Sequence, residues 1–150
     1  MIKSPLRYPG GKSRAVKYLY QFIPPYQEFR EPFLGGGSVS FYCVQNRNDA
    51  KYYASDINYE LYCFWKSLRE SRDKLLREIL KIKKTYSDGR KLFRDILERR
   101  EDDLSDLQRG IDFFVLNRIT FSGVVDSGGY SQQAFEKRFT RSSVERIEKA

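Results

Sequence analysis

The chain has 150 residues, with 28 lysines and arginines against 20 aspartates and glutamates, a net charge of +8 and no histidine. Without histidine, the sequence excludes an imidazole base, a Ser-His-Asp or Cys-His catalytic pair and the usual histidine-containing zinc site. Its two cysteines, Cys43 and Cys63, form no C-x-x-C motif, so we expect neither a thiolate metal site nor a disulfide framework.

Length and hydropathy indicate one soluble globular domain, or part of one. A hydrophobic content of 40% is typical of a folded protein, and no apolar run approaches the roughly 20 residues of a membrane helix. Because the N-terminus lacks a secretory signal, we expect a cytoplasmic protein without a membrane partner. Basic residues precede the first acidic residue, Glu28, which predicts an anion-facing surface. These basic residues are Lys3, Arg7, Lys12, Arg14 and Lys17.

The first predicted elements are a helix and a strand. Residues 13–23 carry apolar side chains at helical spacing, and Pro24-Pro25 ends this helix. Residues 26–33 are rich in aromatic side chains and lead into the glycine run 35–37. This pattern predicts a short strand followed by a glycine loop.

A helix and a second strand follow the glycine loop. Ser38 is the predicted cap of a helix over residues 39–44. Residues 51–55 form the second predicted strand, which ends at Asp56. The order of strand, glycine turn, helix, strand and acid predicts a chain of the α/β class with a βαβ start.

Residues 59–108 change to alternating charges with helical periodicity. Breaks at residues 87–89 and 101–105 divide this segment into scaffold helices. The apolar stripes consist of Leu61, Phe64, Leu68, Leu75, Ile79 and Ile82, and of Leu92, Phe93, Ile96 and Leu97.

The C-terminal third contains a more apolar helix over residues 111–120 and then a glycine-rich loop over residues 122–131. Such a loop is a candidate for function. Ser142 and Glu145 have the spacing of a capping box, which predicts a last helix that reaches Ala150.

Gly10-Gly11-Lys12 resembles the end of a phosphate-binding P-loop, but Leu6 stands where that loop requires glycine. An ATPase is therefore disfavoured. Two interpretations stay open: an anion site made from free backbone N–H groups, and a simple turn.

The glycine run 35–37 lets the backbone approach a nucleotide-like ligand. Asp56 follows about 20 residues later, where a carboxylate accepts ribose hydroxyl groups in nucleotide-binding βαβ units. Ser40 stands in place of the third glycine of a dinucleotide motif, and Glu28 and Glu31 interrupt the strand. A cationic ligand such as S-adenosylmethionine suits this acidic surrounding better than NAD.

Three sequence motifs, taken together with their order along the chain, resemble those of the Dam-type (D12 class) DNA adenine N6-methyltransferases. Three shorter motifs resemble the DNA-recognition region of the same family. The resemblance implies a partial Rossmann-like fold that binds S-adenosylmethionine, a helical target-recognition insertion, double-stranded DNA as partner and no metal. The three motifs are residues 5–12, 31–38 and 55–58, and the DNA-recognition motifs are residues 116–118, 121–123 and 129–131.

By this resemblance Tyr8, Lys12 and Asp56 contact S-adenosylmethionine, with Asp56 on the ribose and the glycine loop on the methionine part. The full set of predicted cofactor residues is Tyr8, Gly11, Lys12, Glu31, Pro32, Phe33, Gly35, Gly37, Ser38 and Asp56.

The same resemblance places the loop 121–130 on DNA, with Phe121 near the base stack and Arg118 and Arg138 on phosphates. Asp126 stands where family members that methylate GATC carry an arginine, and a carboxylate favours a cytosine amino group over guanine. The predicted DNA-binding residues are Arg118, Phe121, Ser122, Asp126, Tyr130, Lys137, Arg138 and Arg141.

The resemblance divides the chain into a cofactor region (residues 1–58), a helical DNA-recognition region (59–141) and a helix that returns to the catalytic domain (142–150). The family's catalytic Asp-Pro-Pro-Tyr motif is absent from the sequence, so no catalytic residue is assigned. We expect the N-terminal portion of a methyltransferase, inactive without a missing C-terminal half. Two alternatives stay open: a non-catalytic DNA- or S-adenosylmethionine-binding remnant, and a small nucleotide-dependent oxidoreductase.

Overall fold

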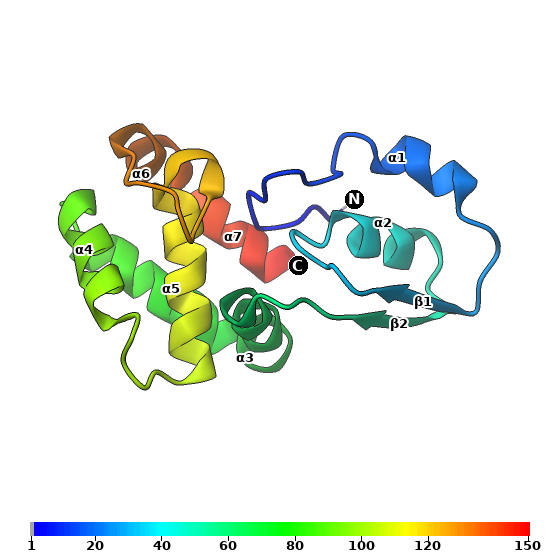
Figure 1. The fold of residues 1–150 in the computed structure, drawn as a ribbon, viewed down its shortest axis with the longest axis horizontal. Helices are drawn as coiled ribbons and strands as arrows, with labels where there is room; N and C mark the ends of the chain where they lie inside the picture. The colour runs from blue at the N-terminus through cyan, green and yellow to red at the C-terminus, as the bar shows by residue number, and fades with distance from the viewer. Residues whose placement is uncertain (1) are drawn as a thin grey trace.

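A computed structural model describes residues 2–150. Figure 1 shows an N-terminal part with two strands and two short helices, placed beside a larger group of helices. The fold is therefore helix-rich and mixed, which agrees with the predicted α/β class in its coarse form.

The first helical segment is shorter than the predicted helix over residues 13–23. Helix α1 covers Val16–Leu19, and the 3-10 helix η1 covers Tyr20–Phe22. The carbonyl of Lys12 accepts hydrogen bonds from the amides of Ala15 and Val16 at 2.9 and 2.7 Å, so the preceding residues form a turn. The segment ends just before the two prolines, as predicted.

The predicted βαβ start is confirmed, with shorter strands. β1 (Glu28–Glu31) and β2 (Lys51–Ala54) pair in parallel, and α2 (Ser38–Asn46) connects them. Phe29 and Tyr52 are half-buried with ring centroids 5.9 Å apart. The side chains that alternate with them are exposed, so only one face of this sheet is covered.

The predicted cap of α2 is wrong by one position. Gly37 is the N-cap residue, with φ of 68°, and Ser38 is already the first helical residue. The amide of Ser40 instead donates to Glu31 at 3.1 Å. This hydrogen bond gives a partner to one of the free backbone N–H groups in the first turn of the helix.

The helical part contains two short helical elements that the sequence pattern does not predict. The 3-10 helix η2 (Phe121–Gly123) lies at the start of the glycine-rich loop, and α6 follows that loop. Helix α7 begins after Thr140 rather than Ser142, because Thr140 and Ser143 form the capping box. The helices are α3 (Tyr59–Thr85), α4 (Gly89–Arg99), α5 (Asp106–Ile119), α6 (Gln132–Arg138) and α7 (Arg141–Lys149).

The main core lies where α5 crosses α3, and it takes in the predicted apolar stripes except for Leu97, which is exposed. Phe64 of α3 stacks on Phe114 of α5 with ring centroids 5.6 Å apart, and both are fully buried. Leu61, Leu75 and Ile79 are also completely buried. No helix within residues 2–150 is both long and apolar enough to cross a membrane.

The N-terminal segment is fixed to α5 by a buried amide. The side chain of Asn117 accepts from the amide of Arg7 at 3.0 Å and donates to the Arg7 carbonyl at 2.7 Å. It also donates to the carbonyl of Gly123 at 2.9 Å. One side chain thereby holds the N-terminal segment and the glycine-rich loop together.

Candidate functional site

Tyr8 packs directly on the glycine loop. A Cβ atom added at Gly35 would lie 2.9 Å from Cε1 of Tyr8, and one added at Gly36 would lie 2.8 Å from its Cβ. Gly35 also has φ of 49°, a value that favours glycine. Glycine at both positions therefore allows the motif of residues 5–12 to pack against the motif of residues 31–38.

Asp56, in the motif of residues 55–58, is hydrogen-bonded to the same glycine loop. Its Oδ2 accepts a hydrogen bond from the amide of Gly35 at 2.8 Å, and its Oδ1 accepts from the amide of Asn58 at 3.0 Å. Each carboxylate oxygen can accept a second bond. Two very exposed apolar side chains come directly after the strands, Phe33 at 81% and Ile57 at 95% exposure.

Tyr8 borders two cavities. The first, of about 320 Å³, is also bordered by Gly11, Gly36 and Ser38. The second, of about 150 Å³, is bordered by Asn58 and Asp126. Segments far apart in the sequence thus share one site around a single tyrosine ring. Burial, and then the charges of the two nearby aspartates, raise the pKa of Tyr8, so its hydroxyl stays protonated.

Three predicted cofactor residues have other contacts in this structure. Lys12 is exposed, and its Nζ donates to the carbonyl of Gly10 at 2.8 Å. Burial raises the pKa of Glu31, which accepts hydrogen bonds from the amide and hydroxyl of Ser40. Pro32 is exposed, and its carbonyl accepts from the hydroxyl of Ser55 at 3.4 Å.

Asp126, predicted to read a base, forms an ion pair with Arg100. Arg100 also donates to both carboxylate oxygens of Glu60, at 2.8 and 2.7 Å. The glycine-rich loop is therefore attached to the end of α4 and the start of α3. About two thirds of the Asp126 side chain remains exposed.

The predicted phosphate contact of Arg118 is wrong for this structure. Its side chain is only 2% exposed, and it donates to the carbonyl of Pro5. Its guanidinium lies over the ring of Phe114, 5.2 Å from the centroid. Arg118 lies on the face of α5 that packs into the protein, so its side chain contacts the buried side of the N-terminal segment.

The remaining predicted DNA residues divide into two groups. Ser122, Lys137 and Arg138 border a third cavity of about 220 Å³ beside Phe121, which is 63% exposed. Two others have contacts elsewhere, since Tyr130 packs against Phe93 with centroids 6.0 Å apart and Arg141 pairs with Glu145 at 3.2 Å.

Sequence reasoning missed several residues of this site. Trp65 donates from Nε1 to the carbonyl of Gly35 at 3.0 Å and so holds the glycine loop from α3. Arg7 borders both the first and the third cavity, and Arg146 borders the first. Arg7 belongs to the basic N-terminal segment seen in the sequence, but no local pattern marks Trp65 or Arg146.

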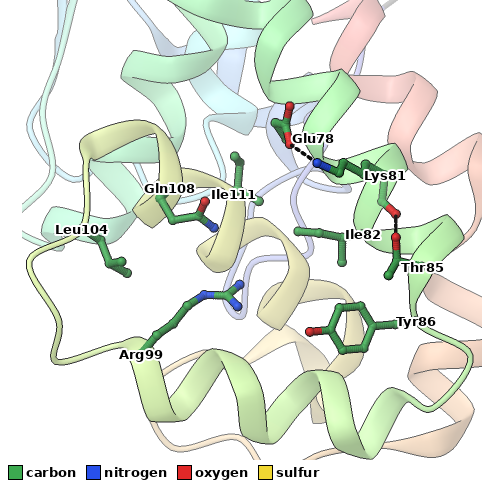
Figure 2. Close-up of a pocket in the computed structure, with 9 residues that line it drawn as sticks. All are labelled: Glu78, Lys81, Ile82, Thr85, Tyr86, Arg99, Leu104, Gln108 and Ile111. Atoms are coloured by element: carbon green, nitrogen blue, oxygen red, sulfur yellow. Dashed lines mark hydrogen bonds and ion pairs between the residues drawn. The ribbon is translucent and has the colours of Figure 1, made fainter.

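A separate groove of about 390 Å³ lies between α3, α4 and α5 and is lined by none of the predicted cofactor-binding or DNA-binding residues. Figure 2 shows Arg99 of α4 and Gln108 of α5 directed toward it from opposite sides. Both bind Asp112, with Arg99 at 2.8 and 2.5 Å and Gln108 at 2.9 Å. These polar groups satisfy one another and hold α4 on α5.

Residues 2–150 contain no group of three or more histidine, cysteine, aspartate or glutamate side chains arranged to hold a metal ion. The donors at the Tyr8 site are backbone amides, hydroxyls and guanidinium groups, which suit an organic ligand with anionic and hydrogen-bonding parts.

Curated proteins with similar sequences are methyltransferases or methylases by name. The chain is 27% identical over 137 residues to "Type II methyltransferase M.MjaIII" of Methanocaldococcus jannaschii, covering 82% of this chain and 47% of that protein. It is 26% identical over 119 residues to a "DNA adenine methylase" of Vibrio cholerae, covering 79% of this chain and 42% of that protein. The chain therefore spans about half the length of these relatives.

A "DNA N-6-adenine-methyltransferase" of Escherichia phage P1 is 27% identical over 124 residues, which is 81% of this chain and 16% of the phage protein. The family model described as "D12 class N6 adenine-specific DNA methyltransferase" matches residues 8–150. This match includes the Tyr8 site, the helical region and the glycine-rich loop. The resemblance found in the ordered motifs is confirmed, and the chain belongs to the D12 class of N6 adenine-specific DNA methyltransferases.

Proposed function

We propose that this chain supplies the methyl-donor site and part of the DNA-binding surface of an enzyme that transfers a methyl group from S-adenosylmethionine to N6 of adenine in DNA. The observation that carries this proposal is the position of Tyr8. It packs on the glycine loop and borders one cavity with Ser38 and another with Asp126. A donor and a DNA base would be brought together at such a junction.

The residues present fit the proposed donor. The absence of Cβ atoms at Gly35 and Gly36 lets the Tyr8 side chain pack on the glycine loop and border the cavity. The cavity of about 320 Å³ falls within the usual range for small-molecule sites, about 300–1,000 Å³. Its basic lining residues, Lys3, Arg7 and Arg146, suit the carboxylate of the methionine part rather than the sulfonium group. Outside this cavity, Asp56 offers free lone pairs to ribose hydroxyls, and Phe33 and Ile57 offer apolar surface to a purine ring.

S-adenosylmethionine, when bound, supplies an activated methyl group. The chain's contribution is positional: Asp56 fixes the glycine loop through Gly35, and Trp65 holds the same residue from the helical side. Rigid placement of this kind lowers the entropy cost of bringing two reactants together. The sequence has no Asp-Pro-Pro-Tyr motif, so we assign no residue to the amino group of a flipped adenine.

In this proposal the fold is part of a Rossmann-like methyltransferase domain. Residues 1–58 form the cofactor region, residues 59–141 form the DNA-recognition region, and α7 leads back toward the catalytic domain. The parallel βαβ unit that ends at Asp56 supports this division. The net charge of +8 supports a polyanionic partner.

On the proposed DNA surface, Phe121 contacts the base stack, and Ser122, Lys137 and Arg138 contact the backbone. The exposed Phe121 ring and the basic cavity beside it support this arrangement. Asp126 keeps an exposed carboxylate for a cytosine amino group even while it pairs with Arg100. Arg118 is left out because it is buried.

Calorimetric titration with S-adenosylmethionine tests the donor site. Asp56→Ala should weaken binding by about 1.5–3 kcal/mol, the scale of hydrogen bonds to a charged group. Asp49→Ala is the matched control, since Asp49 is an exposed carboxylate of the same region that pairs with Arg47. Equal affinity of a folded Asp56→Ala variant and the wild-type chain would remove Asp56 from the site.

A non-catalytic donor- or DNA-binding protein is the second candidate, favoured by the missing Asp-Pro-Pro-Tyr motif. Transfer of tritiated methyl groups to DNA separates the two functions. We expect the 150-residue chain alone to transfer none, and activity only with the missing motif supplied. Incorporation by the purified chain, lost in Asp56→Ala, would show that another group replaces the motif.

A further inference from the structure

The segment that carries Tyr8 is fixed to α5 through its main chain. Asn117 is completely buried, accepts from the amide of Arg7 at 3.0 Å and donates to the Arg7 carbonyl at 2.7 Å. Arg118, the next residue of α5, donates to the carbonyl of Pro5. These bonds hold the main chain just before Tyr8. The position of α5 therefore decides where the Tyr8 ring meets the glycine loop.

The 3-10 helix η2 packs against the same segment. Asn117 also donates to the carbonyl of Gly123 at 2.9 Å. Gly123 has φ of 75°, and a Cβ atom added there would overlap the carbonyl oxygen of Arg7. Glycine allows both this backbone conformation and this close approach. Arg7, Asn117 and Gly123 form one unit, which we call the amide clamp.

η2 also forms a wall shared by two cavities. Ser122 borders the first cavity, together with Tyr8, and it borders the third cavity beside α6. Its φ of 53° is the only positive value at a non-glycine residue within residues 2–150. Such a backbone conformation persists only where the surrounding structure holds it. Gly123 follows directly, so the amide clamp supplies this support.

The amide of Asn117 has no group left for a ligand. Its oxygen accepts one hydrogen bond and its nitrogen donates two, and all three partners are main-chain atoms of Arg7 and Gly123. Gly123 is buried as well. These two residues lie in motifs that resemble a DNA-recognition region, yet their contacts are directed at the segment that carries Tyr8.

We propose that Asn117 and Gly123 are positioning residues of the donor site. They fix the main chain of Arg7 and the wall formed by η2, and so hold the Tyr8 ring on the glycine loop before a ligand arrives. A site that is ordered in advance loses less entropy on binding. This inference rests on the proposed function, and it extends the donor site from residues 1–58 into the helical region.

Calorimetric titration with S-adenosylmethionine in the absence of DNA tests the effect on donor binding. Asn117→Ala and Gly123→Ala should each weaken binding about fivefold to tenfold, the scale of one lost aromatic contact. Because no DNA is present, this loss cannot come from a missing DNA contact. Gly123→Ala adds a methyl group without removing a side-chain hydrogen bond, so it tests the amide clamp even where Asn117→Ala fails to fold.

Two matched controls should keep the wild-type affinity. Gly129→Ala lies in the same glycine-rich loop, where an added Cβ atom would meet nothing within 4 Å. Asn46→Ala removes a side-chain amide whose bond to the carbonyl of Tyr42 is exposed. An affinity equal to that of these controls in folded Asn117→Ala and Gly123→Ala variants would reduce the amide clamp to a structural role and overturn the proposal.

Fluorine NMR tests the position of the ring without any ligand. With 3-fluorotyrosine in place of Tyr8, a single fluorine signal reports the surroundings of this ring. Asn117→Ala and Gly123→Ala should move the signal toward that of the free amino acid, and the two controls should leave it unchanged. An unmoved signal in both clamp variants would overturn the proposal. A moved signal, with no S-adenosylmethionine binding by the wild-type chain, would contradict the proposed function and leave the positioning of Tyr8 by the amide clamp standing.

Discussion

The sheet region (residues 2–58) and the helical region (residues 59–150) are packed very differently. The buried hydrophobic side chains of the main core come almost entirely from the helical region, and the sheet region contributes only Leu6 to it. One face of β1 and β2 is exposed, although parallel strands are usually covered on both faces. Stability therefore resides in the helices, whereas all of the predicted cofactor residues lie in the less packed sheet region.

The largest effect on stability should come from replacing a buried aromatic side chain of the main core with alanine. Phe114→Ala removes a fully buried ring stacked on Phe64, so it should lower the free energy of unfolding by about 3–5 kcal/mol. Phe29→Ala, in the half-covered sheet, should cost only about 1 kcal/mol. Urea unfolding of both variants measures the difference, and equal losses would contradict the comparison.

Removing the amide that joins the two regions should have a smaller effect. Asn117→Ala leaves the partly buried amide and carbonyl of Arg7 and the buried carbonyl of Gly123 without this partner, so we expect a loss of about 2–3 kcal/mol. Amide hydrogen exchange should show faster opening of residues 6–8 than of α5. The matched control is Asn46→Ala, which removes one exposed side-chain bond to the carbonyl of Tyr42. A protection pattern identical to that of the control would show that the two regions are held together by other contacts.

The smallest effect concerns pH, and the two regions should respond in opposite directions. Hydrogen bonds from Lys66 and then Tyr59 lower the pKa of Asp106 at the start of α5. The folded state therefore favours its charged form, and this stabilisation is present above the ordinary aspartate value of 3.8. It is lost as the pH falls through the lower folded pKa.

In the sheet region, burial raises the pKa of Glu31 above its ordinary value of 4.5. The folded state favours the protonated form, so this contribution is present below 4.5 and is lost as the pH rises through the folded pKa. The free energy of unfolding can be measured with denaturant from pH 3 to 7. Between pH 3 and 4 it should fall less steeply with falling pH in Asp106→Asn than in the wild-type chain. Above pH 4.5 it should decrease less with rising pH in Glu31→Gln. Parallel curves for both variants and the wild-type chain would contradict these assignments.

Local patterns predicted most of the secondary structure because local interactions decide it. The apolar stripe from Leu61 to Ile79 fixed the buried face of α3, and Asp88 and Ser105 cap the next two helices through their own side chains. The predictions were wrong at Ser38, where the backbone of Gly37 replaces a side-chain cap, and at Ser142, where Thr140 caps instead. Helix α6 was missed because its seven residues are too few for a clear periodic pattern.

The candidate site was predictable in its motifs but not in its contacts. The glycine run and Asp56 were found from spacing, and their hydrogen bond at 2.8 Å joins the two predicted parts. The packing of Tyr8 on the loop and the pairing of Asp126 with Arg100 have no local signature. Each contact depends on how separate elements approach one another.

The sequence by itself determined the family and the βαβ start, because ordered motifs and periodicity are properties of the chain. Only the tertiary structure decided which arginines face solvent. Arg118 and Arg138 look equivalent in the sequence, yet α5 buries one against Phe114 and α6 exposes the other. Side-chain direction on a packed helix is set by the neighbouring elements, and desolvation then gives identical residues opposite roles.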